Sequence, residues 1–144
     1  MDPHMPAPTL PLTTVADLMR REIDRFICAA RERCEYDIDT RRRAMRRYHR
    51  SWPLLVNQPD SGEDLSAALH SASANGIGFL CDHAFAPDEI VLIKLFWHEE
   101  SALRVPAVVR HATSYRHANL IGCEFAVDDP QACQASLRRR CWYD

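Results

Sequence analysis

The hydrophobic residues near the start of the chain recur with a helical period. Across residues 14–34 they fall at steps of three and four, so they lie on one face of a helix. This stripe consists of Val15, Leu18, Met19, Ile23, Phe26, Ile27 and Ala30. Thr13 or Thr14 offers the hydroxyl of an N-cap, and no glycine or proline follows before Pro53. We therefore predict a helical extension over residues 14–40, preceded by a disordered tail, the proline- and threonine-rich residues 1–13.

A different pattern, that of short strands separated by turns, follows Ser51 and belongs to a domain predicted over residues 41–144. β-Branched and aromatic residues are most concentrated in residues 90–97, IVLIKLFW. The predicted strands are residues 52–57, 65–71, 77–81, 90–97, 105–111 and 120–127. Six short strands with short connections favour a mainly β fold, a small antiparallel barrel or sandwich. Asp128 or Asp129 then caps a closing helix.

The composition is that of a soluble globular chain. Of its 144 residues, 47% are hydrophobic and 26% are charged, which suits one domain with an appendage. No apolar run approaches the roughly 18 residues of a membrane span, and the first residues do not resemble a signal peptide. A cytoplasmic location without membrane contact is therefore expected.

Six cysteines and seven histidines raise the question of metal binding or catalysis. The chain has no C-x-x-C pair and no histidine spacing typical of zinc, and the apolar runs around Cys81 and Cys123 favour core positions. His111 and His117 flank a predicted loop, ATSYR, without the nucleophile context of a hydrolase. We expect reduced thiols, no metal or other cofactor and no enzymatic activity.

Positive charge is concentrated in one segment, although the whole chain has a net charge of −2. Six arginines lie within the ten residues 41–50, directly before the first predicted strand. Such a segment is either a solvated basic helix end or a site for an anion. A nucleic-acid site that adds the arginines of residues 138–140 is disfavoured, because the chain is net negative and lacks an exposed-aromatic stacking pattern.

A second distinctive segment, HSASANGIGFL at residues 70–80, contains two of the four glycines, Gly76 and Gly78. Asn75 and Gly76 form an NG pair, which on local grounds favours a hairpin turn. Glycine is also used where another group has to approach the backbone closely. The local sequence leaves both interpretations open, with the hairpin favoured.

Together, the two segments resemble the PilZ domain family. RRYHR at residues 46–50 matches the family's first motif, R-R-x-x-R. SASANG at residues 71–76 matches its second motif, D-x-S-x-x-G, except that Ser71 stands where the family has aspartate. LIGCEF at residues 120–125 is similar to the family's final strand. The resemblance covers about residues 41–130 and leaves the N-terminal helix outside it.

The resemblance implies a six-stranded antiparallel β-barrel followed by a helix, and a receptor for the bacterial second messenger cyclic di-GMP. This ligand has two phosphates and two guanines, and the planar fork of arginine suits both. By the resemblance, Arg46 and Arg50 are the main guanine and phosphate ligands, and Arg47 is an accessory one. The remaining implied ligand-binding residues are Ser71, Ser73 at a guanine edge, Gly76 where the backbone approaches the base and, outside the motif, Asn75.

The Ser71 departure leaves two functional alternatives. A carboxylate there would accept hydrogen bonds from guanine N1–H and N2–H, whereas a hydroxyl offers a neutral contact about half as strong. The chain is either a cyclic di-GMP receptor that relays occupancy to a protein partner, or a PilZ-like adaptor that acts through protein contacts without nucleotide. The expected partner belongs to motility or polysaccharide machinery. The apolar stripe of the helix packs on its own domain or joins copies into a homo-oligomer.

Overall fold

The computed structural model describes residues 12–33, 46–47 and 52–141. Its elements, in order, are α1 (Leu12–Arg33), β1 (Arg46–Arg47), β2 (Pro53–Asn57), β3 (Asp64–Ala72), β4 (Gly76–Cys81), β5 (Ile90–Lys94), β6 (Arg104–Tyr115), β7 (Ala118–Phe125) and α2 (Pro130–Cys141). Arg50, most of the predicted tail and the predicted continuation of the first helix to residue 40 lie outside the described residues. Helix α1 begins at Leu12, so Leu12 and Thr13 are helical and do not belong to a tail.

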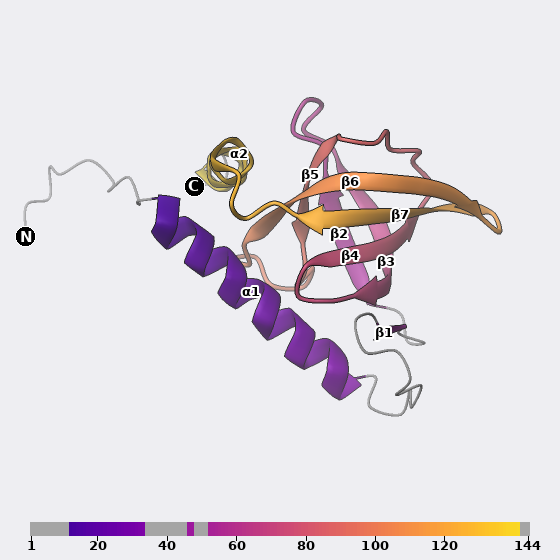
Figure 1. The fold of residues 1–144 in the computed structure, drawn as a ribbon, viewed down its shortest axis with the longest axis horizontal. Helices are drawn as coiled ribbons and strands as arrows, with labels where there is room; N and C mark the ends of the chain where they lie inside the picture. The colour runs from indigo at the N-terminus through magenta and orange to yellow at the C-terminus, as the bar shows by residue number, and fades with distance from the viewer. Residues whose placement is uncertain (1–11, 34–45, 48–51, 142–144) are drawn as a thin grey trace, which may run out of the picture.

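Strands β2 to β7 form a closed antiparallel barrel, which confirms the predicted fold (Figure 1). Around the barrel the order is β2, β5, β6, β7, β4 and β3, and β3 pairs again with β2. The short strand β1 is added to the end of β3, where Arg46 is opposite Ala72 and Arg47 is opposite Ser71. Side chains alternate between the interior and the outer wall. On β4, for example, Ile77 and Phe79 are buried in the core.

Two strands differ from the prediction by three or more residues in length. β5 ends at Lys94 rather than at residue 97, and Trp97 is 47% exposed in the turn that follows. β6 extends to Tyr115, so most of the predicted loop ATSYR is strand. Residues 111–114 of β6 are all exposed and show no hydrophobic alternation, but they pair with β7 in a hairpin that reaches past the other strands (Figure 1). The partner strand, not a local pattern, makes this segment a strand.

Helix α1 packs its apolar stripe against its own barrel, as one of the two alternatives predicted. Val15, Met19, Ile23, Phe26 and Ala30 are at most 3% exposed and join the barrel core in one cluster. The ring of Phe26 meets Trp52 and Phe96 edge to face, with centroids 5.3 and 6.3 Å apart. The stripe is thus buried within one copy of the chain.

A cluster of charged side chains connects the same helix to the turn after β5. Arg25 donates to both oxygens of Glu99 at 2.9 Å and to Glu22 Oε1 at 3.0 Å, and its guanidinium lies 3.6 Å from the centroid of the Phe96 ring. The hydrogen bond with Arg25 lowers the pKa of Glu99, and that with Glu99 raises the pKa of Arg25. Glu99 therefore connects the turn after β5 to helix α1.

Helix α2 begins as predicted, and Asp129 is its N-cap. Asp129 Oδ1 accepts hydrogen bonds from the backbone N–H of Gln131 at 3.0 Å and of Ala132 at 3.4 Å. The neighbouring Asp128 instead forms an ion pair with Arg20 of α1. The ion pair connects α1 to the segment directly before α2, and the two helices lie near each other beside the barrel (Figure 1).

The buried cysteines behave as small core residues. Cys81, Cys123 and Cys133 are buried and unpaired, and burial raises the pKa of Cys123 to about 12. Its thiol therefore stays protonated at neutral pH. Within the described ranges, no group of three or more His, Cys, Asp or Glu side chains is placed to hold a metal ion. In the same ranges, neither helix has the length and apolar character needed to cross a membrane.

Candidate ligand groove on the barrel wall

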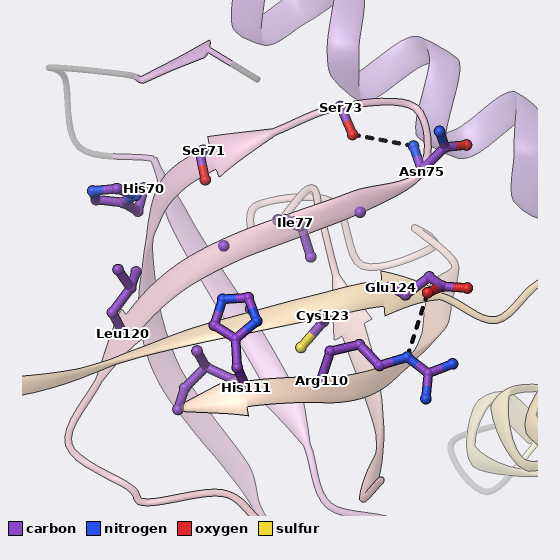
Figure 2. A pocket seen from close by; sticks show the side chains of 14 residues that line it. His70, Ser71, Ser73, Asn75, Ile77, Arg110, His111, Leu120, Cys123 and Glu124 are labelled. Carbon is purple, nitrogen blue, oxygen red and sulfur yellow. Dashed lines mark hydrogen bonds and ion pairs between the residues drawn. The ribbon is translucent and has the colours of Figure 1, made fainter. Parts of the chain in front are cut away.

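Four neighbouring strands contribute one row of residues to the outer wall of the barrel. Ser71 of β3 is opposite Gly78 of β4, Gly78 is opposite Gly122 of β7, and Gly122 is opposite His111 of β6. Two glycines in the middle of the row leave the wall without side chains there. The result is a groove of about 440 Å³, with Ser71 on one side and His111 on the other (Figure 2).

The two central glycines are required by the side chains beside them. A Cβ atom on Gly78 would lie 2.7 Å from Ser71 Oγ, and one on Gly122 would overlap the imidazole ring of His111. Both side chains therefore lean over the glycine floor. A larger residue at either position would push Ser71 or His111 out of its place at the groove.

Gly76, the glycine of the second motif, is required by the close approach of the neighbouring strand. A Cβ atom there would lie 2.5 Å from the backbone oxygen of Cys123 on β7, so glycine permits the close pairing of β4 with β7. The predicted hairpin is present, but Gly76 is the first residue of β4 and its φ is not positive. The backbone N–H of Ser73 donates to Gly76 O at 2.9 Å, which places Ala74 and Asn75 in the turn.

The predicted site residues that the structure describes gather around this groove. Ser71, Ser73, Asn75 and Gly76 line it, and Ser71 is 9% exposed. Ser73 Oγ accepts a hydrogen bond from the backbone N–H of Asn75 at 3.3 Å, which stabilises the turn. Pairing of β1 with the end of β3 brings the backbone of Arg46 and Arg47 beside Ser71 and Ala72. The two motifs, about 25 residues apart in sequence, therefore meet at the Ser71 end of the groove.

Sequence reasoning missed the residues that β6 and β7 add to the groove. His111, Arg110, Gly122, Leu120 and Glu124 all line it. Arg110 Nε lies 3.4 Å from Glu124 Oε2, and Arg110 Nη1 lies 3.4 Å from Asp88 Oδ1. The resemblance of LIGCEF to a family strand was a signal for Gly122 and Glu124. No signal pointed to Arg110 and His111 as site residues, because both lie in the predicted strand at residues 105–111 and its neighbour in the groove is set by the pairing with β7.

A second hollow adjoins the groove at its Asn75 end. It has a volume of about 540 Å³ and lies between helix α1 and the β3–β4 turn, where Arg20, Ile23 and Asp24 face Ala74 and Asn75. Asn75 and Glu124 line both hollows. The groove therefore adjoins a hollow that helix α1 helps to line.

The chain is a small closed β-barrel with a groove on its outer wall, and the short strand that carries Arg46 and Arg47 is added beside this groove. The PilZ domain matches residues 40–141. The chain belongs to the PilZ domain family.

The comparison with solved structures finds the following similar chains, among others. The Bacillus subtilis inhibitor of motility (MotI/DgrA) has a TM-score of 0.46 and 18% identity, over 69% of this chain and 52% of that one. The MrkH–c-di-GMP complex of K. pneumonia has a TM-score of 0.49 and 14% identity, over 67% and 49%. The PilZ domain of YcgR from Escherichia coli with c-di-GMP has a TM-score of 0.43 and 13% identity, over 68% and 87%.

This chain thus spans about half the length of the MotI and MrkH chains that it matches. No curated protein matches its sequence.

Proposed function

We propose that this protein is a receptor for cyclic di-GMP that relays occupancy to a protein partner. The observation that carries the proposal is the pairing of Arg46 and Arg47 with Ala72 and Ser71, which brings the two family motifs together at the rim of one groove. Family membership and the c-di-GMP named for MrkH and YcgR support the choice of ligand.

The volume and lining of the groove support a cyclic dinucleotide as its ligand. Its volume of about 440 Å³ lies within the range of small-molecule sites. The side chains of Ser71 and His111 lie over Gly78 and Gly122, and Ser71 and Asn75 provide polar groups at the edges of the groove. The arginine segment supplies the cations for two phosphates, and arginine also recognises the O6/N7 edge of guanine.

Ligand binding in the groove can affect the surface of helix α1 through the turn that contains Asn75. Asn75 and Glu124 line the groove and also the hollow beside helix α1. A ligand that contacts this turn changes the surface that α1 and the turn present together. Such a change alters the affinity for a partner only if the partner binds the two states differently. We place the partner in bacterial motility or polysaccharide machinery.

Calorimetric titration of the full chain with cyclic di-GMP tests the proposal. We expect saturable binding of cyclic di-GMP and much weaker binding of cyclic di-AMP and GTP. If the folded protein does not bind cyclic di-GMP, the receptor function is wrong, and the adaptor alternative becomes the better account. That alternative is favoured by one observation, the hydroxyl of Ser71 where the family motif has a carboxylate.

Ser71→Asp should strengthen the binding of cyclic di-GMP by about five- to thirtyfold, because an added charge-assisted bond contributes about 1–2 kcal/mol. Residue 71 lines the groove opposite Gly78, and its side chain lies over the position that a Cβ atom on Gly78 would take. That carboxylate would accept from guanine N1–H and N2–H. The measurement is a parallel titration of variant and wild type.

Ser71→Asn is the matched control for this change. It adds a side chain of the same size without the charge, so it should give at most a small gain in affinity. Equal affinities of the Asp variant and the wild type would contradict the guanine-facing role of residue 71.

A further inference from the structure

The groove contains one carboxylate among its described lining residues, and it is not at the motif position. Glu124 lies on β7, directly opposite Gly76 of β4. Figure 2 shows its side chain at the same end of the groove as Asn75, whereas Ser71 lies toward the other end. The chain therefore lacks the family's carboxylate at residue 71 but presents a carboxylate to a different part of the same groove.

The Glu124 carboxylate has acceptor capacity left for a ligand. Its side chain is 60% exposed, and among the described residues its hydrogen-bond donor is Arg110, at the long distance of 3.4 Å. An ionised carboxylate has about four acceptor positions. Arg110 also compensates the negative charge of Glu124, so that a dianionic ligand is not repelled from this end of the groove.

Glu124 and residue 71 are too far apart to serve the same base edge. They lie on β7 and β3, the two neighbours of β4, and their partners on β4 are Gly76 and Gly78. Two strand spacings separate them by about 10 Å across the sheet, and two residues by about 7 Å along it. A cyclic dinucleotide has two bases, so each end of the groove can face one of them.

We propose that Glu124 is a specificity-determining residue that accepts hydrogen bonds from N1–H and N2–H of one guanine, at the Asn75 end of the groove. This inference rests on the proposed function. Two carboxylate oxygens match two parallel N–H donors, and bonds to an ionised acceptor are the stronger kind. Adenine is disfavoured at this position, because its N1 is an acceptor and faces an acceptor-only carboxylate.

Glu124→Gln tests the assignment, with cyclic di-GMP and cyclic di-IMP as the two probes. Hypoxanthine keeps N1–H and lacks the N2 amino group. In the variant, the amide NH₂ of glutamine would meet the guanine N2 amino group, donor against donor, while its oxygen still accepts from N1–H. We expect the variant to bind cyclic di-GMP about tenfold more weakly and cyclic di-IMP with a smaller loss. The preference for guanine over hypoxanthine should therefore fall.

Asp88→Asn is the matched control, because Asp88 is the other carboxylate that contacts Arg110 but does not line the groove. Its φ of 70° is a conformation that asparagine tolerates. An effect that acts only through the release of Arg110 would appear in this variant as well. We expect Asp88→Asn to leave both affinities and the guanine preference unchanged.

Three outcomes overturn the inference, and one of them also overturns the proposed function. If wild type does not bind cyclic di-GMP, the receptor function and the role of Glu124 both fail. If wild type binds and Glu124→Gln has no effect, the role of Glu124 fails alone. The same holds if Glu124→Gln weakens both probes equally, because a purely structural role would do that.

Discussion

Arg46→Ala and Arg50→Ala are each expected to weaken the binding of cyclic di-GMP by about 10- to 150-fold, which corresponds to the loss of a charge-assisted contact of about 1.5–3 kcal/mol. Both arginines match the first family motif. The backbone of Arg46 pairs with that of Ala72 at the Ser71 end of the groove. Arg46 therefore lies at the place where we expect the ligand. Calorimetric titration of each variant against wild type measures the loss, and circular dichroism verifies that the variants are folded.

Arg21→Ala is the control for charge alone. Arg21 is an exposed arginine of α1 that does not line the groove, so its replacement removes the same formal charge from another surface. We expect an affinity close to that of wild type. Wild-type affinity in both motif variants would place the ligand site elsewhere on the molecule.

Phe26→Ala is expected to lower the free energy of unfolding by about 3–5 kcal/mol, as for other large-to-small changes of a buried phenylalanine. Phe26 is fully buried, and its ring contacts Trp52 and Phe96 edge to face. Trp52 in turn donates from Nε1 to Leu95 O at 2.8 Å, so the cluster joins α1 to the barrel. Urea denaturation, followed by tryptophan fluorescence, gives the free energies of unfolding of the variant and of the wild type.

Cys28→Ala, an exposed change two residues along the same helix, should alter the free energy of unfolding by no more than about 0.5 kcal/mol. The protein concentration provides a second check. Since α1 packs on its own barrel, the loss in Phe26→Ala should be the same at low and high concentration. A loss that appears only at high concentration would instead place the stripe in a contact between copies of the chain.

The architecture of this protein was predictable because its signals are local. Each signal can be recognised from a few neighbouring residues, by their hydrophobic period or by their side-chain type. Examples are the helical stripe from Val15 to Ala30, the β-branched run at residues 90–97 and the acidic cap before Pro130. The six strands of the barrel were located from such signals, although the ends of β5 and β6 were not. The family motifs also named Ser71, Ser73 and Gly76, which the structure places together at one groove.

Only the tertiary structure decided what else forms that groove. Its central row, Ser71, Gly78, Gly122 and His111, depends on the register of three strand pairings. Two of these pairings shift register, between Leu69 and Ser71 and between Val109 and His111, and a one-residue shift moves a side chain to the other face of a strand. Short-range patterns do not encode such shifts. The sequence alone shows that the motif's carboxylate is absent at residue 71. The position of Glu124 in the groove became visible only in the folded structure, because it depends on these pairings.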